Sequence, residues 1–138
     1  MRIRNFVLFL AVLAVVSLAW SQEYQPKFKG DPAKSDSEAA ALGFMRTVVT
    51  AEKNFKTKHN VYATSLQALA GTGSITRRTV ASNKRGDYTV SFSGKPDAYK
   101  LTMTPATIDA THRAFLVDQS GKIKAEEDKP ATETSPAV

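Results

Sequence analysis

Residues 35–58 carry one continuous amphipathic pattern, and the rest of the chain must supply partners for its apolar side. Apolar residues recur there at every third or fourth position, which is the spacing of one buried face of an α-helix. Ser35 and Glu38 have the spacing of a capping box, in which the hydroxyl and the carboxylate each accept a backbone N–H at the helix start. Asn60 offers a left-handed stop. The pattern predicts one helix with an apolar stripe at Ala41, Leu42, Phe44, Met45, Val48, Ala51 and Phe55, and with Arg46, Glu52, Lys53, Lys56 and Lys58 mostly on the opposite side.

The apolar period then changes to two, which is typical of strands with one buried face. Residues 88–93 and 99–104 alternate in this way on either side of a turn, so that one face is apolar and the other is rich in hydroxyl groups. Residues 113–117 predict a third strand, and residues 122–124 predict a brief return strand after a second turn. An antiparallel sheet of three or four strands packed on the helix buries both apolar faces, so we expect an α+β fold.

The segment between the helix and the strands contains a second, shorter helical pattern. Thr64 or Ser65 is placed to cap it. Its apolar residues are expected to fold back onto the first helix; they are Val61, Tyr62, Leu66 and Leu69. Residues 74–86 are polar and basic, which predicts an exposed loop, with a short edge strand inside it as an alternative.

Length and composition limit the classes of protein that this chain can belong to. The chain has 138 residues and no cysteine, which is the size of one domain and excludes a disulfide framework or a thiolate metal site. Its formal net charge is +6, of which Arg2 and Arg4 contribute two units and the remainder contributes +4. A charge of this size supports solubility and weak attraction to anionic surfaces, and it falls short of a nucleic-acid-binding signature.

The N-terminal segment has the composition of an export signal. Arg2 and Arg4 precede an apolar run at residues 6–20, and a small-x-small pattern closes it at Ala19, Trp20 and Ser21. This pattern predicts a signal peptide at residues 1–21, with an uncleaved inner-membrane anchor as the alternative. The run is shorter than the roughly 20 residues that a membrane-spanning helix needs. In either case we expect the rest of the chain to be exported, to the periplasm or outside the cell.

The remaining boundaries follow from composition. Residues 22–34 predict a linker, because Pro26 and Pro32 forbid a continuous helix from the leader into residue 35. Residues 35–124 then form the globular domain. Residues 125–138 contain no large apolar anchor and predict a disordered tail.

Three short motifs in this order resemble the globular part of type IV pilin-like proteins and type II secretion pseudopilins. They are Ala51-Glu52-x-x-Phe55, Asn60-x-Tyr62-x-x-x-Leu66-x-x-Leu69 and Phe115-Leu116-Val117-Asp118-x-Ser120-Gly121-x-Ile123. The resemblance covers about residues 38–124. It implies a non-enzymatic, exported structural or interaction protein of the bacterial cell envelope, associated with pilus or type II secretion machinery, and partners among the other proteins of that machinery.

The leader departs from the pattern of that family. Pilin-like proteins carry a glycine before a phenylalanine, with a glutamate four residues after it. Here Asn5 precedes Phe6 and Leu10 lies at the fourth position after it, and Phe9 fits no better. We therefore expect a pilin-type globular domain that has an ordinary export signal in place of a filament-forming stem.

No constellation of residues predicts catalysis, a metal site or a cofactor site. His59 and His112 are the two histidines of the chain and share no short metal-ligand spacing. A small secreted hydrolase, the least favoured alternative, would need one of them to meet a carboxylate and a serine in space. Asp118 lies in the sequence D-Q-S-G and is expected to be a turn residue.

The basic segment supplies the one candidate binding surface. Arg77, Arg78, Lys84 and Arg85 are candidates for contact with a polyanion such as DNA, and a solvated loop is the simpler interpretation. Tyr88 and Tyr99 are expected in the core, because they alternate with hydroxyl or lysine residues in the strand patterns. A membrane contact is expected only if residues 6–20 are retained.

Overall fold

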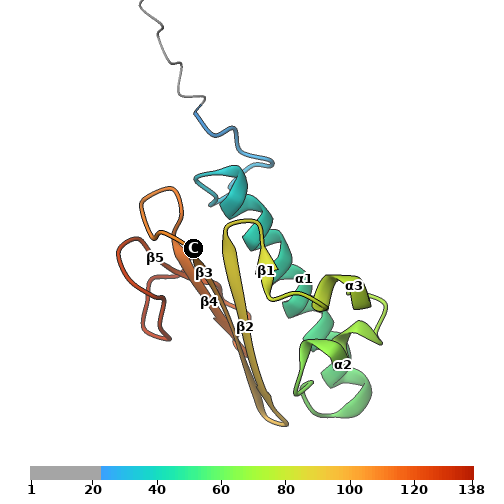
Figure 1. Ribbon diagram of the computed structural model, residues 1–138. Helices are drawn as coiled ribbons and strands as arrows, with labels where there is room; N and C mark the ends of the chain where they lie inside the picture. The colour runs from blue at the N-terminus through green and yellow to red at the C-terminus, as the bar shows by residue number, and fades with distance from the viewer. Residues whose placement is uncertain (1–22) are drawn as a thin grey trace, which may run out of the picture.

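The computed structural model describes residues 23–138. These residues form an α+β domain in which one five-stranded antiparallel sheet packs against a helix, α1 (Figure 1). The α+β prediction is therefore confirmed. The predicted leader at residues 1–21 lies outside the described residues.

Helix α1 spans Asp36–His59, one residue later at each end than the predicted helix. The Ser35 hydroxyl accepts the N–H of Glu38, as a capping box requires. The Glu38 carboxylate does not complete the box, because it accepts the N–H of Lys34 at 2.8 Å. At the other end, Asn60 takes a left-handed conformation with φ of 60° and donates its N–H to the carbonyl of Lys56, which confirms the predicted stop.

Two short helices follow α1. Helix α2 spans Leu66–Ala70, with Ser65 as its N-cap, and its Leu69 is fully buried. Val61, in the loop before α2, is 38% exposed, so the prediction that Val61 packs on α1 was wrong. Helix α3 spans Arg77–Val80. The sequence predicted a loop there, and a helix of four residues is too short to show a period.

Five strands follow the helices, and each pairs with the next one along the chain. They are β1 Lys84–Arg85, β2 Tyr88–Lys95, β3 Ala98–Pro105, β4 Ala114–Asp118 and β5 Lys124–Glu126. The observed five strands are one more than the upper end of the predicted three or four. The additional strand is the short edge strand β1, which lies within residues 74–86, where the sequence predicted a loop with a short edge strand as the alternative.

The core lies between α1 and the sheet. Leu42, Met45 and Val48 of α1 are fully buried together with Leu101 and Met103 of β3. Complete burial of one such side chain contributes about 1.5–3 kcal/mol. The predicted core positions Tyr88 and Tyr99 are also buried, at 0% and 4% exposure.

The loop after α1 is fixed to the β2–β3 hairpin by a close approach at Gly94. A Cβ atom on Gly94 would lie 2.3 Å from the carbonyl oxygen of Ala63, a distance that no side chain can accept. The N–H of Tyr62 donates to the carbonyl of Pro96 at 2.9 Å in the same region. The glycine therefore allows the loop to pass directly over the hairpin.

The C-terminal segment continues the fold beyond the predicted boundary at residue 124. Strand β5 extends through Glu126, and residues 127–138 turn back along the side of the sheet away from α1 (Figure 1). Ala125 donates its N–H to the carbonyl of Pro136, and Val138 donates its N–H to the carbonyl of Ile123. Backbone hydrogen bonds thus hold this segment against β5. The sequence predicted a disordered tail because the segment has no large apolar side chain.

Candidate functional site

An ion pair between Glu38 and Arg113 is buried where the start of α1 meets β4. Glu38 is 0% exposed and Arg113 is 6% exposed. The guanidinium donates through Nε to Oε1 at 3.0 Å and through Nη2 to Oε2 at 2.8 Å, and the backbone N–H of Arg113 donates to Oε1 at 2.9 Å. Nη2 also donates to the carbonyl of Pro32 at 2.6 Å.

Every polar atom of this carboxylate has a partner, since the Lys34 N–H completes the set of donors. A buried bidentate pair of this kind fixes the geometry of the elements that it joins, and loss of one member leaves an uncompensated charge. The pair is therefore a connection between α1 and the sheet, with no open position for a ligand.

A second carboxylate on α1, that of Glu52, is also fully buried. Its Oε2 accepts the N–H of Ala63 at 2.9 Å, and its Oε1 is buried without a hydrogen-bond partner. Burial raises the pKa of Glu52.

The prediction that Glu52 faces solvent was wrong. The spacing of Ala41, Met45, Val48, Glu52 and Phe55 places it within the apolar stripe, and that signal was present in the sequence.

The structure distributes the four candidate polyanion-binding residues over different surfaces. Arg77 and Arg78 are exposed on α3, whereas Lys84 and Arg85 belong to β1. Because side chains alternate along a strand, the last two point to opposite faces. Lys84 donates to the hydroxyl of Thr89 at 2.7 Å, and the Arg85 guanidinium lies 4.7 Å from the ring centre of Phe44 on α1.

His112 meets carboxylates, as the hydrolase hypothesis requires, but within residues 23–138 no serine hydroxyl forms a hydrogen bond with its ring. Its Nδ1 lies 3.1 Å from Asp109, and its Nε2 lies 3.9 Å from Asp87. The nearby hydroxyl of Ser37 donates to Asp87 at 2.9 Å and not to the imidazole. The ring of His59 lies against Phe55 at a centroid distance of 4.3 Å. His59 thus ends α1, and His112 lies in the connection before β4.

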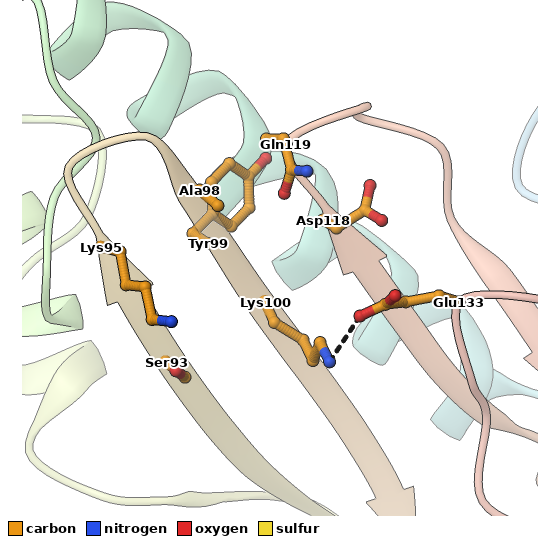
Figure 2. A pocket seen from close by; sticks show the side chains of 8 residues that line it. All are labelled: Ser93, Lys95, Ala98, Tyr99, Lys100, Asp118, Gln119 and Glu133. Carbon is orange, nitrogen blue, oxygen red and sulfur yellow. Dashed lines mark ion pairs between the residues drawn. The ribbon is translucent and has the colours of Figure 1, made fainter.

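Two hollows lie near the turn of the β2–β3 hairpin, and both are lined by Tyr99 and Gln119. The first has a volume of about 270 Å³ and is shown in Figure 2. In it Lys100 forms an ion pair of 2.6 Å with Glu133. The second, of about 380 Å³, is lined by Lys53, Lys56 and Tyr62 among others. Burial raises the pKa of Tyr99 above that of an ordinary tyrosine, so its hydroxyl stays protonated beside both hollows.

Asp118, which also lines the first hollow, is held as a turn residue. The N–H of Ser120 donates to its Oδ1 at 2.9 Å, as the D-Q-S-G pattern predicts. Within residues 23–138 no group of three or more His, Asp or Glu side chains could hold a metal ion. In the same part of the chain no helix has the length and apolar character needed to span a bilayer.

Comparison of the chain with protein-family models, with curated proteins and with solved structures finds no match.

Proposed function

We propose that this chain is a non-enzymatic, exported structural or interaction protein of the bacterial cell envelope, with a pilin-like globular domain and a role in pilus or type II secretion machinery. One observation carries this proposal: a helix lies across an antiparallel meander, and a short second helix separates the two in the chain. That order matches the order of motifs on which the resemblance to pilin-like proteins rests.

Contacts between two of the three motifs support the proposal. Glu52, from the first motif, accepts the N–H of Ala63, which lies within the second. Tyr62 of the second motif packs edge-on against Tyr99 of β3, with ring centres 5.2 Å apart. Residues of the first two motifs therefore meet in one interface between the end of α1 and the sheet.

The non-enzymatic part of the proposal is supported by the environment of His112. Catalysis by a serine nucleophile needs a hydrogen bond between the hydroxyl and the imidazole. Ser37 instead donates to Asp87, and the Asp109 carboxylate is held by the N–H and hydroxyl of Thr111 as well as by His112. This cluster is better suited to fixing the loop before β4 than to activating a nucleophile.

The export part of the proposal rests on the sequence of residues 1–21 alone. It is tested by fractionating native cells and measuring the intact mass and N-terminal residue of the protein. We expect an envelope form that starts at Gln22, or a membrane-bound form that retains residues 6–20. A full-length cytosolic form would overturn the proposal.

The assembly part needs a separate measurement. A photo-reactive amino acid at the exposed α1 position Thr47 is expected to cross-link the protein in living cells to a pilus or secretion subunit of the envelope. Thr107, exposed in the loop between β3 and β4, is the matched control position. Cross-links from Thr47 to proteins unrelated to such machinery would overturn the assignment and leave the export result intact.

A further inference from the structure

The face of the sheet that points away from α1 carries hydroxyl groups and lysines. Strand register places these side chains on one face, because residues directly opposite each other in neighbouring strands point the same way. The hydroxyl groups belong to Thr89, Ser91, Ser93, Thr102 and Thr104, and the lysines are Lys84, Lys95, Lys100 and Lys124. The same register places two carboxylates on this face, Asp118 opposite Lys100 and Glu126 opposite Ala114, so the lysines outnumber them. We call this surface the outer face.

The C-terminal segment covers the part of the outer face over β4 and β5. Leu116 belongs to the outer face and is nevertheless only 3% exposed. A hollow of about 410 Å³ lies beside it, between Lys100 and Thr102 on the sheet and residues 131–134 of the C-terminal segment. The segment thus lies along the outer face beside Thr102 and leaves Ser91 and Ser93 of β2 exposed.

Glu133 shows how an acidic, extended chain contacts this face. Its carboxylate pairs with Lys100 at 2.6 Å, and its backbone carbonyl accepts a hydrogen bond from Nζ of Lys124. Both members of the ion pair are about half exposed, at 46% and 60% for their side chains. An ion pair this exposed contributes at most about 1 kcal/mol, so another carboxylate can replace Glu133.

Further cationic positions lie next to this contact. Figure 2 shows Lys95 and Ser93 beside Lys100 and Glu133 in the same hollow. Among the described residues, no carboxylate lies within ion-pair distance of Lys95 or Lys84. Thr89, opposite Lys84, and Lys95 are six positions apart on β2, a length of about 20 Å at the rise of a strand.

We propose that the outer face binds an extended acidic peptide segment of a partner protein, whose carboxylates contact Lys95 and Lys100 in place of Glu133. A peptide fits better than a nucleic acid for two reasons. The uncovered positions of β2 and β3 on this face present no aromatic side chain on which a base could stack. The occupant already present is a carboxylate on an extended chain. This inference does not depend on the pilin-like proposal.

The test is binding of a fluorescein-labelled oligoglutamate peptide to the full chain, measured by fluorescence anisotropy at about 20 and about 200 mM salt. We expect salt-dependent binding. Glu133→Gln removes the internal competitor and should tighten binding about two- to five-fold. Lys100→Gln should weaken it by a similar factor and should also abolish the gain from Glu133→Gln, because the two side chains act as a pair.

Two variants with the same change of net charge serve as controls. Lys58→Gln, at the exposed end of α1, matches Lys100→Gln, and Glu127→Gln, which loses an ion pair with Lys34 elsewhere on the surface, matches Glu133→Gln. Equal effects of a variant and its control would overturn the proposal, as would the absence of binding at low salt. Tighter, Lys100-dependent binding of a single-stranded oligonucleotide of equal charge would reassign the face to nucleic acid.

Discussion

Glu38 and Glu52 lie on the same helix and are both fully buried, yet their surroundings differ. Glu38 is in the first turn of α1, where the helix dipole favours a negative charge, and it accepts hydrogen bonds from Arg113 and Lys34. Glu52 is near the other end of α1, has no cationic partner among the residues described, and has one hydrogen bond, from Ala63. A buried carboxylate can therefore stabilise one end of a helix and carry a free-energy cost at the other.

The largest effect is expected from removal of the partner of Glu38. Arg113→Met leaves the Glu38 charge buried and unpaired, so the free energy of unfolding should fall by about 3–5 kcal/mol. Urea denaturation at neutral pH measures this loss. The control is Lys100→Met, which breaks an exposed ion pair and should cost less than about 1 kcal/mol. If Arg113→Met cost no more than its control, Glu38 would not depend on its partner and the contrast with Glu52 would fail.

An intermediate effect is expected from displacement of the one donor to Glu52. The Cβ atom of Gly94→Ala would lie 2.3 Å from the carbonyl oxygen of Ala63 and would push away the residue whose N–H holds Glu52. We expect a loss of about 1–3 kcal/mol in thermal or urea denaturation. Gly43→Ala is the control, since its Cβ meets nothing within 4 Å and the change should stabilise α1 by about 1 kcal/mol. A neutral Gly94→Ala variant would mean that the loop moves freely over the hairpin.

The smallest effect is expected from Glu52→Gln, and its sign is opposite. Because burial raises the pKa of Glu52, the native protein holds this proton to higher pH than the unfolded chain does. The free-energy cost of burying this charge is absent when the pH is below the ordinary pKa of 4.5. It is complete when the pH is above the raised pKa of Glu52 in the native protein. Glu52→Gln should therefore stabilise the protein by about 1 kcal/mol at neutral pH and remove the advantage that the parent protein gains on acidification.

Stability curves from pH 4 to pH 8 for the parent and for Glu52→Gln check this prediction, with Glu38→Gln as the matched variant. Glu38→Gln should destabilise the protein at neutral pH, because it weakens a paired charge. If both glutamine variants changed the free energy of unfolding in the same direction, the proposed difference between the two ends of α1 would be refuted.

Local patterns account for the parts of the fold that the sequence predicts. The helix at Asp36–His59 and the alternation in β2 and β3 depend on residues a few positions apart, and both are seen with nearly the expected bounds. Helix α3 and strand β1 are too short to produce a period. The C-terminal segment is held by backbone hydrogen bonds, which leave no trace in side-chain hydrophobicity.

The charged sites were harder to predict than the elements that carry them. Glu38 was expected to cap its own helix, and nothing in the sequence links it to Arg113, 75 positions away. Glu52 was placed in solvent by its charge although its position belongs to the apolar stripe. The basic residues of 74–86 looked like one cluster because they are near in sequence, and the alternation within β1 separates Lys84 from Arg85.

The strand order also has a kinetic consequence. Each strand pairs with its neighbour in the chain, so most of the sheet can form from contacts that close short loops, which favours rapid folding. The ion pair between Glu38 and Arg113 closes a far longer loop of the chain, and it contributes no stabilisation until β4 has packed against α1. We therefore expect substitutions at Arg113 to accelerate unfolding while they leave the rate of folding nearly unchanged, so that this connection lengthens the lifetime of the folded domain.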